Sequence, residues 1–354
     1  MSRLNLSFSE RIGIGFGFIL GLIRATFDVL AVPFQRSNGP ISLKRHLMLI
    51  FLRVFPSSFS PRAMVSFSPS TDETYRKVLK QECLEPESIY LDDGTPVHFL
   101  GDPNAENTLL YFHGGGYVVP PTDAHFQLLL ETLQRIEEHG GKLRVLFLQY
   151  DLAVISTYPR QLQQASALLK YALNTLGKKP EQILLAGDSA GGNLLLALLS
   201  HILHPHPQVD SIKFDGRFSS VALLSPWITF NTVKTPSMRL NRYKDVLALS
   251  IITEWASLFA GNAPLDAYLQ PHEAPGDWFR GLPVKNLLLM AGADEVFVDH
   301  LREFGGILRD VFPPTTIEIV KDEAHCHLIL ESLMGESNSK QRAIFQDWII
   351  KSVV

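Results

Sequence analysis

The chain has 354 residues, 46% hydrophobic and 19% charged, so it is long and apolar enough to bury a substantial core and is not a disordered tail. Its formal net charge of −4 argues against nucleic-acid binding, which usually requires a basic face. The two cysteines, Cys83 and Cys326, are too few for a disulfide framework or a cysteine zinc site.

The first 70 residues are both basic and apolar. They hold eight Lys or Arg and two acids, a balance of +6, whereas the rest of the chain holds 24 basic and 34 acidic residues. Residues 12–23 carry no charge, but about twenty apolar residues are needed to span a bilayer. Extending the segment to residue 32 admits Arg24 and Asp28, and a second apolar stretch covers residues 47–55. Three placements stay open: helices packed as a lid on the body, a helix lying on a membrane surface, and a spanning anchor.

From residue 89 the pattern becomes that of an α/β fold. Residues 88–91 and 96–100 flank Asp93-Gly94, which predicts a hairpin. Apolar runs of strand length then alternate with helical patterns, which indicates a mostly parallel sheet covered by helices on both faces. The predicted strands are 108–112, 144–149, 182–186, 220–224, 286–290 and 316–320; the predicted helices are 122–138, 159–176, 190–203, 249–260, 299–311 and 339–352.

The expected organisation is an amino-terminal cap or membrane-contacting segment over residues 1–85 and a catalytic domain over residues 86–354. Residues 229–283 interrupt the alternation and are rich in Pro, Asn and aromatic residues. We interpret them as a cap insertion at the carboxyl edge of the sheet, where ligands bind in such folds.

A serine lies in the motif G-x-S-x-G at residues 187–191, between a predicted strand and a predicted helix. In that context a sharp turn exposes the serine hydroxyl, and glycines are needed beside it. We therefore expect Ser189 to be a nucleophile, with Asp188 and the motif around it as support. The alternative is a glycine-rich turn with a serine that caps the helix.

Three consecutive glycines follow the strand at 108–112, in the run His113-Gly114-Gly115-Gly116-Tyr117. Glycines at a strand end expose main-chain N–H groups that can stabilise a developing oxyanion. The N–H of Ala190, at the start of the next helix, would be a further donor. A flexible turn is the alternative.

The acid and the base of a serine triad would follow in the order Ser, acid, His. Asp294 comes after the strand at 286–290, and His325 comes after the strand at 316–320. We expect Asp294 to orient His325, which would accept the Ser189 proton. Glu295 and Asp299 are rival acids, and His327 is the rival base on an extended segment.

Neither a metal nor a cofactor is expected. His201, His204 and His206 cluster in sequence, but no acid or cysteine completes a site, so we place them in a surface loop. No phosphate-binding glycine motif follows a strand, so no nucleotide cofactor is implied.

Together these motifs resemble the hormone-sensitive-lipase-type α/β-hydrolases over residues 89–350. The resemblance rests on HGGGY at 113–117, GDSAGGN at 187–193, AGAD at 291–294 and the His325 region. It implies that Gly115, Gly116 and Ala190 donate to the oxyanion and that the amino-terminal helices cap the pocket. The block at 150–162 departs from the bacterial pattern, with Asp151 where Arg is usual, and is closer to fungal steryl acetyl hydrolases and to hydrolases of cytochalasan-type metabolite clusters.

We therefore expect a serine hydrolase that cleaves carboxylic esters of a small hydrophobic substrate through an acyl-enzyme. Two alternatives stay open: the same chemistry in a fungal secondary-metabolite pathway, and a non-catalytic ligand receptor on this fold. The expected location is intracellular and membrane-associated, at the endoplasmic reticulum, with the cytoplasm as the alternative. Contact with the membrane surface would run through residues 1–60, and no nucleic-acid partner is expected.

Overall fold

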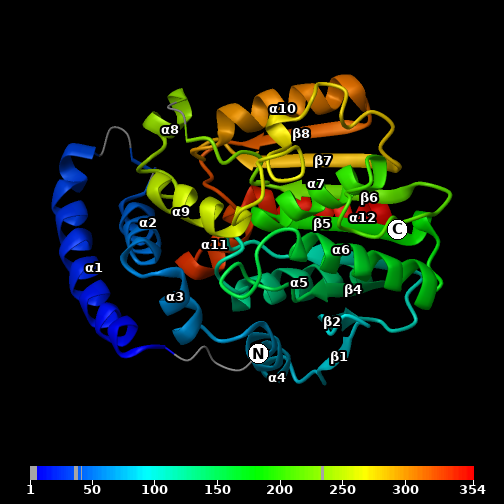
Figure 1. The fold of residues 1–354 in the computed structure, drawn as a ribbon, viewed down its shortest axis with the longest axis horizontal. Coiled ribbons are helices and arrows are strands. Elements are labelled where there is room, and N and C mark those ends of the chain that lie inside the picture. Colours follow the sequence, from blue (N-terminus) through cyan, green and yellow to red (C-terminus); the bar gives the residue numbers. More distant parts are fainter. Residues whose placement is uncertain (1–5, 36–38, 41, 233–234) are drawn as a thin grey trace.

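A computed structural model describes residues 6–35, 39–40, 42–232 and 235–354. Within these residues a central sheet has eight strands in the order β1-β2-β4-β3-β5-β6-β7-β8 (Figure 1). The first two strands and the β2–β4 pair are antiparallel, and the remaining pairs are parallel. This confirms the predicted fold, a mostly parallel sheet with a hairpin at one edge. The strands are β1 (Glu87–Tyr90), β2 (Pro96–Gly101), β3 (Asn107–Phe112), β4 (Leu143–Leu148), β5 (Ile183–Asp188), β6 (Phe218–Leu224), β7 (Val284–Gly292) and β8 (Thr315–Val320).

The six predicted helices are present close to their expected positions, and α7 and α9 have the predicted bounds, whereas α8 and α11 were not predicted. In chain order the helices are α1 (Phe8–Gln35), α2 (Leu43–Val54), α3 (Pro61–Phe67), α4 (Thr71–Gln81), α5 (Asp123–Glu138), α6 (Arg160–Lys170), α7 (Ala190–Leu203), α8 (Pro236–Leu240), α9 (Leu249–Ala260), α10 (Val298–Val311), α11 (His327–Met334) and α12 (Lys340–Val353). Short helical turns occur at η2 (Pro56–Ser58), η3 (Tyr171–Thr175), η4 (Pro180–Gln182) and η5 (Pro271–Glu273).

The central strands β3, β4, β5 and β6 are buried on both faces, because most of their residues are apolar. Successive side chains of a strand point to opposite faces. In β3, Leu109 and Tyr111 belong to the core that includes α5 and α12, whereas Leu110 and Phe112 belong to the core that includes α6 and α7. The continuous apolar runs in the sequence follow directly from this double burial.

The amino-terminal segment forms helices along one side of the molecule (Figure 1). Helix α1 packs on α2 and η2, and Gly17, Ala25 and Val32 are its buried residues. Glycine is needed at position 17 because an added Cβ would lie 2.5 Å from the Ser58 carbonyl oxygen. Of the basic residues in this part of the chain, Arg3 and Arg36 lie outside the described residues.

The chain after β8 differs from the expectation. His327 does not lie on an extended segment but begins helix α11, after Cys326 takes a left-handed conformation with φ +49°. The segment predicted to be a cap insertion, residues 229–283, contains α8, α9 and η5, and α9 lies beside α2 in Figure 1. The division of the chain at residue 85 stays a prediction.

Candidate active site

Ser189 lies in a tight turn between β5 and α7. Its backbone has φ +51° and ψ −115°, a strained conformation for a residue with a side chain. Glycines on either side make the turn possible: a Cβ at Gly187 would lie 2.5 Å from the Gly191 carbonyl oxygen, and one at Gly191 would lie 1.9 Å from that of Phe112. The turn therefore explains why the sequence carries glycine, serine and glycine at this spacing.

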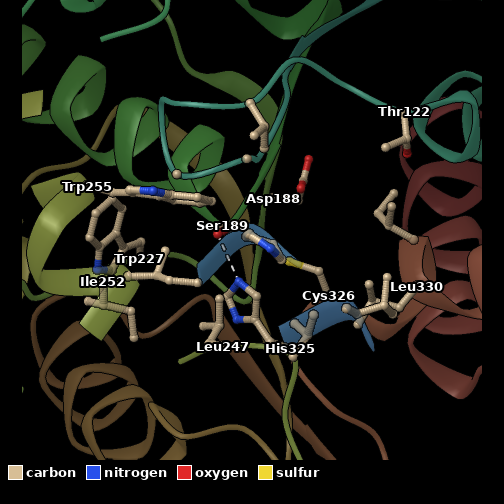
Figure 2. A pocket seen from close by; sticks show the side chains of 18 of the residues that line it. Thr122, Asp188, Ser189, Trp227, Leu247, Ile252, Trp255, His325, Cys326 and Leu330 are labelled. Atoms are coloured by element: carbon tan, nitrogen blue, oxygen red, sulfur yellow. Dashed lines mark hydrogen bonds between the residues drawn. The ribbon is translucent and has the colours of Figure 1, made fainter. Parts of the chain in front are cut away.

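His325 lies in the loop after β8, buried beside the serine. Its Nε2 is 2.8 Å from Ser189 Oγ (Figure 2). Its Nδ1 is 3.0 Å from Glu295 Oε2. With the Nδ1 hydrogen directed at the carboxylate, Nε2 is left to accept the serine proton. The structure thus brings Ser189 and His325 together as the sequence predicted.

The acid next to the histidine is Glu295, not the expected Asp294. The Asp294 side chain turns away to Lys244, with 3.2 Å between the carboxylate and Nζ. Glu295 is fully buried, and its Oε1 accepts hydrogen bonds from Gly292 N and Ser225 Oγ at 2.5 Å each.

This correction has a local cause. The chain turns after β7, where Glu295 N donates to Gly292 O at 3.3 Å. The turn directs the Glu295 side chain back over the end of β7. Glu295, which is longer than Asp294 and follows it in the chain, therefore reaches the imidazole. Nothing in the sequence marked Ser225 as a partner, and Glu295 was only a rival candidate.

Burial and polar contacts act in opposite directions on the histidine. Burial lowers the pKa of His325, whereas the nearby Cys326 sulfur and the Glu295 carboxylate raise it. The net effect holds the pKa of His325 well above its ordinary value of 6.5. The Glu295 carboxylate therefore favours the imidazolium that forms when the ring takes up a proton.

The glycine run forms a loop whose amides line the space beside Ser189. Gly115 and Gly116 have φ of +106° and +60°, conformations that favour glycine. Both residues border the same cavity as Ser189. Within the described residues, no group accepts a hydrogen bond from the main-chain N–H of Gly115, Gly116 or Ala190. These amides are thus available to a ligand oxygen, as an oxyanion site requires.

Buried polar side chains hold the glycine loop in place. The His113 ring stacks on Tyr150 at 4.2 Å between centroids, and its Nδ1 lies 2.6 Å from Gly114 O. Burial and the neighbouring His125 lower the pKa of His113 to about 3, so the ring is neutral. The Asp188 carboxylate accepts a hydrogen bond from Tyr111 at 2.8 Å and leaves no room for a Cβ at Gly114. His113, Gly114 and Asp188 therefore hold the glycine loop in shape.

A cavity of about 200 Å³ borders Ser189 and His325. Its lining includes side chains of three helices distant in sequence: Leu52 of α2, Trp255 of α9 and Leu330 of α11. In Figure 2 Trp255 lies on one side of Ser189 and Leu330 on the other. The cavity is therefore mostly apolar, with the reactive groups at its base.

The remaining histidines make local contacts. His201 lies buried in α7, contrary to the expected surface loop, and its Nδ1 accepts a hydrogen bond from His206 N at 2.9 Å. His204 Nε2 lies 2.9 Å from Trp278 O. The rival base His327 pairs with Glu336 at 3.4 Å and does not contact Ser189.

Two known hydrolases are similar to this chain in sequence. Steryl acetyl hydrolase 1 of Saccharomyces cerevisiae is 27% identical over 46% of this chain and 37% of its own length. An esterase of Acinetobacter venetianus is 27% identical over 57% of this chain and 61% of its own length. The chain thus spans less than two thirds of these relatives.

Solved structures share the fold. A crystal structure of an esterase from the bacterial hormone-sensitive lipase family superposes with a TM-score of 0.64 at 23% identity, covering 88% of this chain and 99% of the esterase. The family model for the alpha/beta hydrolase fold matches residues 109–329, which include the glycine loop, the serine turn and His325. The chain therefore belongs to the α/β-hydrolase family.

Proposed function

We propose that this protein is a serine hydrolase that cleaves carboxylic esters of a hydrophobic substrate. One observation carries the proposal: Ser189 Oγ, the His325 ring and Glu295 form a continuous chain of contacts of 2.8 and 3.0 Å beside unoccupied main-chain amides. This arrangement is what nucleophilic acyl transfer requires.

In the proposed reaction, His325 Nε2 takes the Ser189 proton as Oγ attacks the ester carbonyl. The amides of Gly115, Gly116 and Ala190 hold the oxyanion of the tetrahedral intermediate. His325 then donates the proton to the departing alkoxide oxygen, which leaves an acyl-serine. Water, deprotonated by the same imidazole, attacks the acyl-serine and releases the acid and free Ser189.

The apolar cavity supports a hydrophobic ester as substrate. Side chains such as Leu52, Ile251 and Trp255 offer surface to an apolar alcohol or acyl group. The similarity to a steryl acetyl hydrolase supports an acetyl ester of an apolar alcohol as the first class to test. The proposed activity is therefore that of a deacetylase or carboxylesterase.

We propose that the protein meets such substrates at a membrane surface, and the exposed apolar face of α1 supports this. Helix α1 is long and apolar enough to cross a membrane, and its position near the amino terminus is shared with signal sequences. Many of its large apolar side chains are at least 43% exposed: Phe8, Ile12, Phe16, Ile19, Leu20, Leu22, Ile23, Phe27, Leu30 and Phe34.

The charged residues of α1 favour a helix that lies on the surface. Glu10 pairs with Arg62 at 2.8 Å, Arg24 donates to Ser57 O at 3.1 Å, and Asp28 lies 3.6 Å from Arg53. These contacts extend from residue 10 to residue 28, roughly 27 Å along a helix. Because α1 is attached to the body over this length, we propose that its apolar face rests in the bilayer interface rather than spanning it.

The test is hydrolysis by the purified protein of p-nitrophenyl esters of increasing chain length and of acetylated sterols. We expect turnover by the wild type, none by Ser189→Ala, and normal turnover by Ser219→Ala, a serine at the opposite end of the sheet. A fluorophosphonate probe should label the wild type but not Ser189→Ala. Retained hydrolysis in Ser189→Ala would remove this residue as the nucleophile.

A further inference from the structure

A second buried carboxylate lies next to the Ser189–His325–Glu295 chain without being part of it. Asp245 belongs to the insertion, between α8 and α9, and is 0% exposed. Its Oδ1 accepts hydrogen bonds from Val246 N at 2.7 Å and from His325 N at 3.2 Å. Its Oδ2 accepts one from Val296 N at 2.7 Å. One side chain thus joins the loop after β7 to the loop after β8.

A second side chain of this segment, Asn241, also binds the loop that carries Glu295. The Asn241 side-chain amide donates to Ala293 O at 2.9 Å and to Glu295 O at 2.8 Å. The main chain on both sides of the Glu295 side chain is therefore fixed by Asn241 and Asp245. The histidine and its acid come from different strands, so a link of this kind is needed to hold them in register.

A carboxylate is chemically suited to this position in a way that an amide is not. Both oxygens of Asp245 face main-chain N–H donors, and only an ionised acid is an acceptor at both atoms. An asparagine would direct an NH₂ group at one of these donors. Burial raises the pKa of Asp245 to about 6, so the fold keeps a carboxylate here against an unfavourable environment.

The amino-terminal helix α2 reaches the same segment. Arg53, only 8% exposed, donates to Arg242 O at 3.1 Å and to Asp245 O at 3.2 Å. Its guanidinium also lies 3.6 Å from Asp28 of α1. The two amino-terminal helices thus connect to the segment that holds the acid and base loops.

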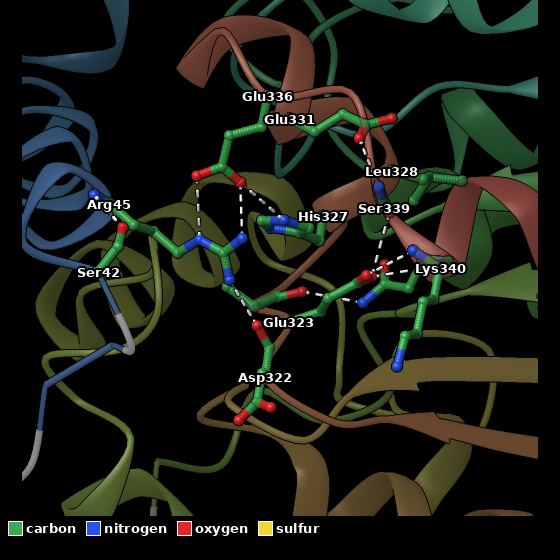
Figure 3. A network of polar contacts seen from close by, with 12 residues as sticks. Ser42, Arg45, Asp322, Glu323, His327, Leu328, Glu331, Glu336, Ser339 and Lys340 are labelled. Atoms are coloured by element: carbon green, nitrogen blue, oxygen red, sulfur yellow. Dashed lines mark hydrogen bonds and ion pairs between the residues drawn. The ribbon is translucent and has the colours of Figure 1, made fainter.

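A second arginine of α2 reaches the loop of the base directly. Arg45 donates to Asp322 O at 2.5 Å, three residues before His325, and its other nitrogens bind the Glu336 carboxylate at 2.6 and 3.3 Å (Figure 3). Glu336 also contacts His327, which follows the base by two residues. Helix α2 therefore contacts the base loop through Arg45 and the segment that holds Asp245 through Arg53.

We propose that Asp245 is a positioning residue that holds the Glu295 and His325 loops in register, and that Arg53 of α2 supports it. The inference rests on the proposed hydrolase function. Asp245 does not touch Ser189 or the substrate carbonyl, so it acts through the two side chains that do the chemistry. Misplacing such groups by about 1 Å can reduce turnover on the order of 100-fold.

The test compares Asp245→Asn with the wild type on p-nitrophenyl acetate. We expect kcat to fall about 10- to 100-fold with KM changed less than about twofold, because the loops shift while the apolar lining remains. The rate of fluorophosphonate labelling should fall by a similar factor. The matched control is Asp266→Asn: Asp266 lies in the same insertion and accepts main-chain hydrogen bonds from Tyr268 and Leu269, both at 3.0 Å, away from the triad. Its kcat should be unchanged.

Arg53→Lys provides a second measurement, since lysine keeps the charge but its single nitrogen cannot replace both Nη1, which binds the two carbonyls, and Nη2, which lies near Asp28. We expect a loss of a few-fold in kcat. A folded Asp245→Asn protein with wild-type kcat would overturn the proposal while leaving the hydrolase function intact. If Asp245→Asn does not fold, an unchanged kcat in Arg53→Lys would overturn it. A wild type that neither hydrolyses esters nor reacts with the probe would instead overturn the proposed function.

Discussion

At the scale of single residues, the acid of the site is decided by one turn of the chain. Asp294 and Glu295 are neighbours in sequence, yet only Glu295 points into the core, where it meets His325. Aspartate is the more usual acid of a serine triad, but the Asp294 side chain contacts Lys244 instead of the imidazole. Two substitutions separate the roles of the two carboxylates.

We predict that Glu295→Gln lowers kcat about 10³- to 10⁴-fold. The amide cannot stabilise the imidazolium and favours the wrong ring tautomer. Asp294→Asn should lower kcat less than about threefold, because Asp294 contacts Lys244 rather than the base. Steady-state kinetics on one ester measures both. The reverse order of effects would assign the acid role to Asp294.

A second prediction concerns Gly116, where any side chain meets an obstacle. A Cβ at this position would lie 2.1 Å from the Trp255 ring, and the φ of +60° also disfavours alanine. We expect Gly116→Ala to displace the oxyanion amides and to lower kcat about 100- to 1,000-fold, the cost of losing one donor. Gly276→Ala is the control, since nothing lies within 4 Å of its Cβ position. Full activity in Gly116→Ala would exclude this loop from oxyanion binding.

At the scale of elements, α1 shows how one helix can serve two environments. Its inner side carries small residues that pack on η2 and charged residues that pair with the body, whereas its outer side is apolar. A helix inside a soluble core would have buried those side chains. The outer face therefore needs a partner, and we propose that it is lipid.

We predict that replacing Phe16, Phe27 and Leu30 together with serine abolishes binding to phospholipid vesicles. Each side chain is about two thirds exposed in the structure, and burying a large apolar side chain contributes roughly 1.5–3 kcal/mol. Co-sedimentation with vesicles, alongside hydrolysis of a soluble ester, is the measurement. The matched control replaces Phe16 and Phe27 with leucine and should still bind. Equal vesicle binding by the serine variant would contradict membrane contact through this face.

At the scale of the whole molecule, the pH dependence of activity reports how the fold surrounds His325. The ring must be neutral to accept the Ser189 proton, and the net effect of burial and its polar neighbours raises its pKa above 6.5. We predict that kcat/KM rises with pH and reaches half its maximum above pH 6.5. In Glu295→Gln the carboxylate is gone, so the pKa of His325 falls and the rise of kcat/KM occurs at lower pH. A rise at the same pH as in the wild type would show that Glu295 does not set the pKa of His325.

Much of the fold and part of the site follow from the sequence. The strand and helix positions could be predicted because apolar periodicity is local, and helix α7 even has the predicted bounds. Ser189, His325 and the glycine loop were also predictable, since their chemistry requires particular neighbours in the chain. Helix α11 was missed because the segment after β8 carries no strong period and begins at a left-handed residue, Cys326.

By itself, the sequence determined the order of strands and helices, the serine turn and the amides beside it, because each depends on residues adjacent in the chain. Only the tertiary structure decided which carboxylate meets His325, since that choice depends on Ser225, which follows β6, and on the turn after β7. It also brought Asp245 to within hydrogen-bonding distance of His325, a residue 80 positions away. Contacts between distant segments arise from packing of the whole chain, and no local pattern records them.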